Sequence, residues 1–401
     1  MTTTTLASHA ARKPHQGFLA HFLLTPQQTL LRRAMFQIHL WAGLLLALYV
    51  ALIGLSGSIT VFRMDLAMCV PHALQAQKLD PSRVMTLDVV QRNLHSAIPG
   101  ARVLSTLAPD EQHHVFASML ATRNARLFAT SDPFTGQVLR VVDMKTNWAF
   151  LIGEFHESLL AGEMGKQING IAAVLLLLVL LSGLLLWWRG IKNWTRGLKV
   201  SFKSNWKRIN YDLHCAVGLW TLLFCLMWSI TTIVMVWPDW SSRTISIVSP
   251  LTDAVKEPEV MAPIHAGKPC SIHPQQMVNA AVAADSGTRF AVYSLMPKPG
   301  QPARIYLARG AIRNRGTWDL VYVDPCSGNV LKVWHRWQFK STADVLIAGS
   351  RMIHVGFIWG FWAQVLWALA GLAFPLLALT SVLMYWNRYL SKQWKKIKIS
   401  C

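Results

Sequence analysis

The chain has 401 residues, of which 53% are hydrophobic and 14% are charged, whereas a soluble domain usually has about 25% charged residues. This composition excludes an ordinary soluble domain and indicates a membrane protein. The formal net charge of +20 is concentrated in three short segments beside apolar runs, which argues against nucleic acid as a partner.

The first half of the chain contains two apolar runs, each long enough to cross a bilayer, which takes roughly 20 helical residues. Residues 1–35 are an N-terminal segment with four basic residues and no acidic residue. Residues 36–62 are the first predicted span, which is too long and starts too far along the chain to be a cleaved signal peptide. Residues 63–167 are a long polar loop, and residues 168–188 are the second predicted span.

The second half has the same order of elements. Residues 189–212 are a basic loop with seven Lys or Arg residues and one acidic residue, and residues 213–237 are the third predicted span. Residues 238–353 are the second long loop. Residues 354–386 combine a histidine-bearing segment with the fourth predicted span, and residues 387–401 are a tail with five basic residues.

The basic residues predict the topology. The segments before the first span, between the second and third spans and after the fourth span together carry a charge of +15. Cytoplasmic segments of membrane proteins are enriched in Lys and Arg, so we expect both termini and the middle loop in the cytoplasm. Membrane lipid is then the expected partner of these residues, and both long loops lie on the opposite side of the membrane.

An internal repeat relates the two halves. His39 and His214 each open a span, each follows an Arg by six residues and each precedes a Gly by four. His156 and His354 each precede a Gly by six residues and lie 32 residues before a Trp at the end of the next span. The four histidines therefore occupy two equivalent pairs of positions.

The long loops repeat as well. DPFTGQVL at residues 132–139 matches DPCSGNVL at residues 324–331, and in each case Pro and Gly favour a tight turn that enters a strand. A probable amphipathic helix precedes each turn, over Leu87–Ile98 and Pro274–Ala284, and alternating strands lie between the helix and the turn. Each loop is therefore predicted to fold as a small α+β module.

Four histidines beside apolar helices favour haem ligation. A neutral imidazole is a good axial ligand of haem iron, and haem b needs only two facing ligands and an apolar slot. The repeat would pair His39 with His214 and His156 with His354. The small residues that would let the flat macrocycle approach the backbone are Gly43, Gly218, Gly162 and Gly360.

Other sites have less support in the sequence. Structural zinc needs Cys or His residues at short spacing, which these four histidines lack. Glu154, Glu157 and Glu163 are candidates for binding a cationic substrate or protons, although a solvated helix face explains them as well. A polar and aromatic cluster at residues 334–337 (WHRW) fits an interfacial aromatic belt as well as a docking site.

The depth of His156 depends on a possible helix break. One straight helix over Phe155–Trp188 would be about 50 Å long, against about 30 Å for the hydrocarbon core. We favour a break at Gly162, Glu163 and Gly165, which makes LIGEFHESLLAG a separate short helix.

The cysteines allow one disulfide among Cys69, Cys270 and Cys326, which are expected on the non-cytoplasmic side. No CxxCH motif occurs, so covalent attachment of a c-type haem is not expected.

The stretches HLWAGLLLALYVALIGLSGSI and EFHESLLAGEMGKQINGIAAVLLLLVLLSGLLLWW and the two Asp-Pro turns resemble the PepSY-associated transmembrane family. The resemblance runs from about Arg32 to Trp386 and is to an iron-regulated branch that includes inner-membrane ferric-siderophore reductases with two haem b groups. One departure is Cys215, where many relatives have Arg after the histidine.

The resemblance implies a membrane α+β protein of the bacterial inner membrane, with four transmembrane helices in two repeated halves and two periplasmic PepSY-like modules. It implies two haem b groups held by His39, His156, His214 and His354, and reduction of Fe(III) in a periplasmic ferric siderophore. The electron donor stays open between a quinol and a cytoplasmic flavoprotein that docks on the basic loop at residues 189–208.

Two other functions remain as alternatives. A haem-free PepSY-type membrane sensor would bind a periplasmic peptide or protein with its modules, and its histidines would be structural. A transporter would also have repeated halves, but four spans are few, and none carries an Asp, Glu, Lys or Arg at mid-depth.

Overall fold

The computed structural model describes residues 30–68, 79–190, 193–252, 256–258, 264–265, 268–269, 272–295, 301–335 and 338–391. The chain divides into two compact units. Unit 1 comprises Met1–Ala47, Leu175–Leu223 and Leu376–Cys401, and unit 2 comprises Leu48–Val174 and Phe224–Pro375. Unit 2 therefore contains both of the predicted α+β modules.

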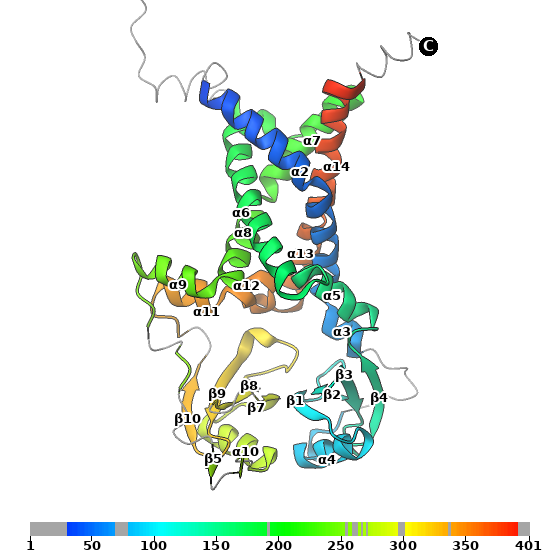
Figure 1. The fold of residues 1–401 in the computed structure, drawn as a ribbon, viewed down its shortest axis with the longest axis vertical. Helices are drawn as coiled ribbons and strands as arrows, with labels where there is room; N and C mark the ends of the chain where they lie inside the picture. The colour runs from blue at the N-terminus through cyan, green and yellow to red at the C-terminus, as the bar shows by residue number, and fades with distance from the viewer. Residues whose placement is uncertain are drawn as a thin grey trace, which may run out of the picture. The chain divides into compact units, whose positions relative to one another are not determined.

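Among the described residues, three helical segments are long and apolar enough to cross a membrane (Figure 1). They are α2 (Leu30–Thr60), α6 (Gly162–Trp187) and the segment Gly360–Leu390, which consists of α13 (Gly360–Gly371), α14 (Ala373–Tyr385) and a π-helical turn (Trp386–Leu390). Helices α7 (Trp206–Trp220) and α8 (Leu222–Val236) together pass the same test, and they form a fourth span if the bent pair is counted as one. A helix suits this role because it pairs its own backbone groups where no water is present.

The third predicted span differs from the structure. We expected one helix over residues 213–237, but α7 begins at Trp206 and is separated from α8 by a bend of 58°. Asn205 caps the start of α7 by accepting a hydrogen bond from the Arg208 amide at 3.0 Å. At the bend, the Thr221 hydroxyl donates to the Val217 carbonyl at 2.7 Å, a contact that often bends a helix.

The chain does break between His156 and the second span. Helix α5 (Trp148–Ser158) ends at Leu159 and Leu160, which have φ of 52° and 59°, and α6 begins at Gly162. At Gly165 an added Cβ would lie 1.6 Å from the Ser158 carbonyl oxygen, so only glycine fits this close approach. His156 therefore lies on a short helix of its own.

His354 also lies outside the long helix that follows it. It belongs to α12 (Ser350–Val355), which ends at Gly356 with a φ of 76°. A 3₁₀ turn over Phe357–Trp359 and Gly360, with a φ of 77°, then lead into α13. The fourth predicted element, residues 354–386, is thus a short histidine helix and a separate long helical segment.

The two predicted modules share one antiparallel sheet within unit 2, in the strand order β10-β9-β8-β7-β1-β2-β3-β4 (Figure 1). Module 1 contains α4 (Leu87–Ala97), β1 (Arg102–Leu107), β2 (Phe116–Ala121), β3 (Arg126–Ser131) and β4 (Val138–Asp143). Module 2 contains α10 (Pro274–Ala284), β7 (Arg289–Ser294), β8 (Ala303–Ala308), β9 (Trp318–Val323) and β10 (Val330–Trp334). Strands β1 and β7 join them, pairing Thr106 with Tyr293. We expected two separate modules and did not predict this continuity.

Both Asp-Pro turns are present and begin with an Asp side chain that caps the turn. Asp132 accepts from the Thr135 amide at 2.8 Å, and Asp324 accepts from the Cys326 amide at 2.8 Å. Gly136 and Gly328 have φ of 69° and 76°, the conformation for which glycine was expected.

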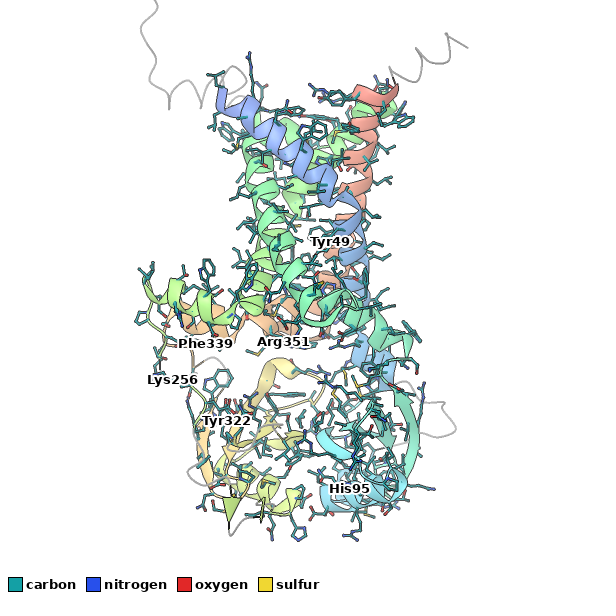
Figure 2. All side chains as sticks on the ribbon, in the orientation of Figure 1. Tyr49, His95, Lys256, Tyr322, Phe339 and Arg351 are labelled. Carbon is teal, nitrogen blue, oxygen red and sulfur yellow. The ribbon has the colours of Figure 1, made fainter. Side chains whose placement is uncertain are left out.

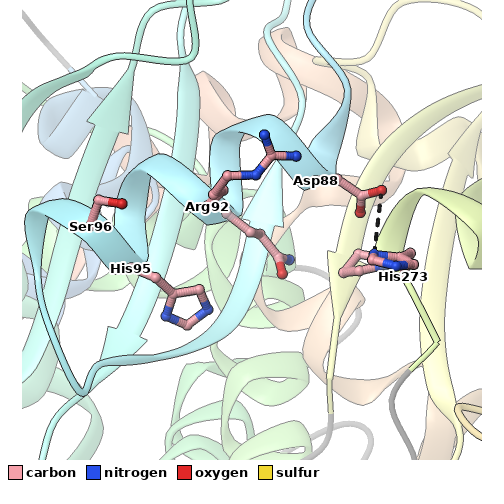
Figure 3. A pocket seen from close by; sticks show the side chains of 7 residues that line it. Asp88, Arg92, His95, Ser96 and His273 are labelled. Atoms are coloured by element: carbon pink, nitrogen blue, oxygen red, sulfur yellow. Dashed lines mark ion pairs between the residues drawn. The ribbon is translucent and has the colours of Figure 1, made fainter.

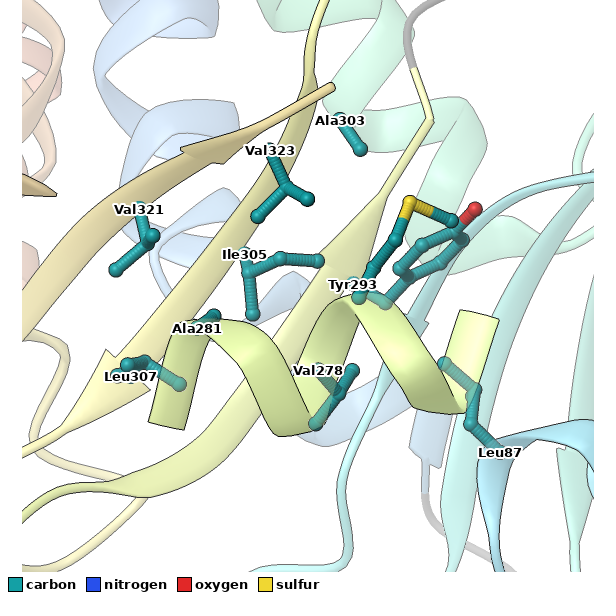
Figure 4. Close-up of a cluster of buried hydrophobic side chains, with 10 residues drawn as sticks. Leu87, Val278, Ala281, Tyr293, Ala303, Ile305, Leu307, Val321 and Val323 are labelled. Carbon is teal, nitrogen blue, oxygen red and sulfur yellow. The ribbon is translucent and has the colours of Figure 1, made fainter. Parts of the chain in front are cut away.

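The cores of the modules touch. Met277, Val278 and Ala281 of α10 pack on Ile305 and its neighbours in the sheet, and Leu87 from α4 of module 1 joins the same cluster (Figure 4). The two modules are therefore packed as well as hydrogen-bonded to each other.

Helix α5 is attached to module 1. Phe150 of α5 packs against Phe128 of β3 with ring centroids 5.3 Å apart, and Ala117 and Met68 complete this cluster. The helix that carries His156 therefore rests on the module sheet.

Shorter elements complete the described chain. They are α3 (Arg63–Met68), α9 (Pro238–Ser246), α11 (Thr342–Ala348), β5 (Ile264–His265), β6 (Lys268–Pro269) and the 3₁₀ turns Pro81–Arg83, Trp194–Gly197 and Arg315–Thr317. Cys326 is disulfide-bonded, and the other two cysteines of the predicted set, Cys69 and Cys270, lie outside the described residues.

Candidate functional site

The first predicted histidine pair lies within unit 1. His39 of α2 and His214 of α7 have ring centroids 6.3 Å apart, with their planes at 83°. His39 Nδ1 lies 3.0 Å from the carbonyl oxygen of Val179 and 3.3 Å from the hydroxyl of Ser182, both on α6. His214 Nδ1 lies 3.0 Å from the hydroxyl of Thr380 on α14.

The second predicted pair lies within unit 2 and repeats this arrangement. His156 of α5 and His354 of α12 also have ring centroids 6.3 Å apart, with their planes at 55°. His156 Nδ1 lies 3.1 Å from the carbonyl oxygen of Ile53 and 3.3 Å from the hydroxyl of Ser56, both on α2. His354 Nδ1 lies 2.8 Å from the hydroxyl of Thr231 on α8.

The hydrogen bonds favour the same ring proton on all four histidines. The hydroxyl beside each histidine can donate to a carbonyl oxygen of its own helix, at 2.7 to 3.1 Å: Thr231 to Met227, Thr380 to Leu376, Ser56 to Ile53 and Ser182 to Val179. Nδ1 of His39 and His156 carries the proton, because the Val179 and Ile53 carbonyl oxygens beside them can only accept. At His214 and His354, a hydroxyl that donates to its own helix accepts from the ring and so favours a proton on Nδ1 as well. In a neutral imidazole with that tautomer, the lone pair is on Nε2, where it can bind a metal.

Two glycines lie directly against the first histidine of each pair. A Cβ added at Gly57 would be 2.7 Å from His156 Cε1, and one at Gly183 would be 2.9 Å from His39 Cε1. Both glycines follow a serine that contacts the same ring, in Leu-Ser-Gly at residues 55–57 and 181–183. This repeated tripeptide is a signal for the site that the sequence analysis missed.

The four glycines that we expected to admit a macrocycle have two different roles. A Cβ at Gly43 would meet no atom within 4 Å, and one at Gly218 would meet only Leu377, at 3.7 Å, so these positions leave room one turn after His39 and His214. Gly162 and Gly360 have positive φ at the starts of α6 and α13. The positive φ itself favours glycine at those two positions, and the space beside Gly162 is open as well, since an added Cβ there would meet no atom within 4 Å.

Buried polar side chains hold the ends of both short histidine helices in unit 2. Asn169 of α6 donates to the carbonyl oxygens of His156 and Glu157 at 2.9 and 3.1 Å, and Tyr49 donates to Asn169 Oδ1 at 2.9 Å (Figure 2 labels Tyr49). Trp228 donates to the carbonyl oxygen of His354 at 2.9 Å. These bonds satisfy carbonyls at helix ends, which have no partner within the helix, and they fix where the histidines lie.

Ion pairs surround the second pair. Of the acidic candidates, Glu157 lies 2.8 Å from Arg63 and 4.0 Å from Arg351 (Figure 2 labels Arg351), so one carboxylate links the helices of both histidines. Burial lowers the pKa of His156, and burial together with His156 and Arg351 lowers the pKa of His354 to about 3. Both rings are therefore neutral at physiological pH, which is the form that binds metal.

A separate polar groove of about 440 Å³ lies on unit 2 beside α4 and α10 (Figure 3). It is lined by Asp88, Gln91, Arg92, His95, Ser96, His273 and Pro274. His273 lies 3.9 Å from Asp88, as the dashed line in the figure shows. None of the four predicted histidines lines this groove, so it is a different feature from the histidine pairs.

Comparison with known protein families gives a match. The family described as PepSY-associated TM region matches residues 36–388, which is most of the chain and includes all four histidines. No curated protein matches the chain in sequence.

Proposed function

The chain belongs to the PepSY-associated transmembrane family, and from this premise we propose that it is a b-type cytochrome with two haem groups. In this proposal it lies in the bacterial inner membrane with both termini in the cytoplasm. It passes electrons to Fe(III) held in a ferric siderophore on the periplasmic side.

The spacing of the two histidine pairs carries the proposal. A metal–imidazole bond is about 2.0–2.1 Å long and the nitrogen is about 1 Å from the ring centre, so two imidazoles on opposite sides of one metal have centres about 6 Å apart. Both pairs have centroids 6.3 Å apart. The hydrogen bonds at Nδ1 also favour a proton on that nitrogen of each ring, which would leave Nε2 for iron. His39 with His214, and His156 with His354, are thus suited to hold one haem b each.

Zinc fits these pairs less well. A structural zinc ion takes four ligands and a catalytic one takes three from the protein. Among the described residues, the group of three or more His, Cys, Asp or Glu side chains with ligand atoms within 4.8 Å of one another includes none of the four histidines. Two imidazoles with centres 6.3 Å apart, outside the group of three or more such ligand atoms found among the described residues, would suit haem better than zinc.

The residues around the rings have defined roles in this proposal. Ser56, Ser182, Thr231 and Thr380 orient the imidazoles and fix their tautomer, as partners of metal-bound histidines do elsewhere. When bound, the haems would supply one-electron transfer, and iron would leave the siderophore because hard oxygen ligands hold Fe(II) less tightly than Fe(III). The electron donor is a quinol or a cytoplasmic flavoprotein on the basic loop.

The first experiment counts haem. The purified chain, expressed with ample haem, should give two haem b per chain in a pyridine haemochrome assay, with a Soret band that shifts on reduction. A chain that binds no haem would refute the cytochrome and favour the haem-free sensor. A chain with one haem would leave a single histidine pair in this role.

The second experiment tests the substrate. Chain reduced under anaerobic conditions should be reoxidised by ferric siderophores, and a colorimetric Fe(II) chelator should recover about one Fe(II) per electron delivered. Fe(III) chelates of the hydroxamate and catecholate classes should be compared with a non-iron oxidant. A dihaem protein that no ferric chelate reoxidises would keep the cytochrome and refute the reductase.

A further inference from the structure

A second cluster of metal-ligating side chains lies in module 2 and takes no part in the proposed function. Asp285 follows α10, Arg309 follows β8, Asp319 is the second residue of β9 and His335 follows β10. Because β9 runs antiparallel to β8 and β10, these residues meet at one end of the three neighbouring strands. The strand order therefore brings together residues that are far apart in the chain.

The geometry of the cluster suits a metal ion. One ligand atom each of Asp285, Asp319 and His335 lies within 4.8 Å of the others. The two carboxylates have side chains only 4% exposed, whereas His335 is 43% exposed and provides access. Two carboxylates and one imidazole form a mixed oxygen and nitrogen set that binds divalent first-row cations.

Arg309 bridges the two buried carboxylates. It donates to Oδ1 of Asp285, and its Nε donates to Oδ2 of Asp319 at 2.6 Å. One guanidinium therefore holds both carboxylates side by side within the cluster.

The second oxygen of Asp285 also indicates that the cluster binds a cation. Oδ2 is buried and has no hydrogen-bond partner in the part of the chain that the structure describes. It faces His335, whose Nδ1 lies 3.9 Å away. A buried carboxylate oxygen without a partner is costly unless something binds it.

The fold of a module does not require the cluster. Aligning the repeats places Ile98, Thr122, Leu127 and Asp143 of module 1 at the positions of Asp285, Arg309, Asp319 and His335. Module 1 forms the same helix and four strands with this largely uncharged set. The buried charges of module 2 are therefore an addition to the shared fold.

We propose that Asp285, Asp319 and His335 bind a divalent first-row transition cation, with Arg309 holding the two carboxylates in place. The cation takes Oδ2 of Asp285, an oxygen of Asp319 and a ring nitrogen of His335. A purely structural cluster, in which Arg309 alone bridges the two carboxylates, is the competing explanation, and the test separates the two.

The test uses the full chain, without a polyhistidine tag and freed of metal, in equilibrium dialysis against Co²⁺ followed by metal analysis. The wild type should bind one more Co²⁺ per chain than His335→Ala and Asp285→Asn, or bind it at least ~10-fold more tightly. His95→Ala, which removes an exposed histidine of module 1, is the matched control and should bind as the wild type does.

Equal Co²⁺ binding by the wild type, His335→Ala and Asp285→Asn would overturn the proposal and leave the cluster as a structural one held by Arg309. If Asp285→Asn does not fold, His335→Ala decides the test, since its half-exposed side chain leaves little packing to lose. Haem content is measured alongside and should equal that of the wild type in both variants, which separates this site from the histidine pairs.

Discussion

The two halves of the chain hold their histidines in different ways. In the first half, His39 and His156 each meet a backbone carbonyl and a serine, with a glycine against the ring. In the second half, His214 and His354 each meet a threonine hydroxyl, and the Leu377 backbone also hydrogen-bonds His214. Each pair takes one histidine from each half, and the support differs most in the second pair, where His156 has a carbonyl and a serine and His354 has the Thr231 hydroxyl. Duplication preserved the ring position, while its surroundings diverged.

The modules differ in a similar way. Module 1 uses one face of its sheet to hold α5, through Phe128 and Phe150, and so is joined directly to the helix of His156. Module 2 instead carries the cluster of Asp285, Asp319 and the half-exposed His335. The two modules therefore share one fold, but module 1 packs against the helix of His156 and module 2 carries the proposed metal site.

The largest expected effect comes from removing a histidine. His156→Ala and His354→Ala should each lower the haem content from two to one and leave the same reduced spectrum, because they empty the same pair. His39→Ala and His214→Ala should each leave the reduced spectrum of the haem that the 156–354 pair holds. Pyridine haemochrome assays and low-temperature spectra make the comparison. If His39→Ala instead gave the same reduced spectrum as His156→Ala, the proposed histidine pairs would not be the pairs that hold each haem.

The glycines against the rings should come next. Gly57→Ala would place a Cβ 2.7 Å from His156 Cε1, closer than such atoms approach, so that ring must move. We expect the 156–354 pair to lose at least about half of its haem, given how strongly ligand geometry controls affinity. Gly183→Ala should do the same to the 39–214 pair. Each variant is the control for the other, and full haem content in both would contradict the packing described here.

The different hydrogen-bond partners of His156 and His354 predict a smaller effect, on the rate of haem release. Thr231→Val removes the partner that the described residues offer to His354 Nδ1, whereas Ser56→Ala leaves His156 with the Ile53 carbonyl at 3.1 Å. Loss of such a partner typically costs 10–100-fold in metal affinity, so Thr231→Val should release haem about 10-fold or more faster than wild type. Ser56→Ala should change the rate only a few-fold. Transfer of haem to a scavenging protein measures both rates. Equal rates would contradict the proposed difference between the hydrogen-bond partners of His354 and His156.

The smallest expected effect concerns pH. Burial acts to raise the pKa of Asp344 in α11, but hydrogen bonds from Thr252 and Lys340 outweigh it and lower that pKa. A carboxyl with a lowered folded-state pKa stabilises the fold above its unfolded pKa of about 3.9, and this stabilisation is lost as pH falls through the folded value. The thermal midpoint of Asp344→Asn should therefore vary less than that of the wild type between about pH 5 and pH 3. Parallel pH profiles for the two proteins would contradict this role.

Much of the architecture was predictable because it depends on local patterns. Apolar run length predicted helices that could cross a membrane, and alternation with turn residues predicted the strands around the turns at Asp132 and Asp324. The prediction failed at Thr221, where one side-chain hydrogen bond accompanies the bend that separates α7 from α8. It also missed the pairing of β1 with β7, since nothing in either strand specifies an edge partner so distant in the chain.

The sequence by itself determined which four histidines are equivalent, because the repeat preserves their spacing from glycines, arginines and span ends. Only the tertiary structure decided how those rings are held. Ser56 lies 100 residues from His156, and Thr231 lies 123 residues from His354. Inside apolar runs these hydroxyls look like ordinary helix residues, and their role exists only once distant helices pack together. The same reason applies to Asp285, Asp319 and His335, which the order of the strands assembles at one end of the sheet.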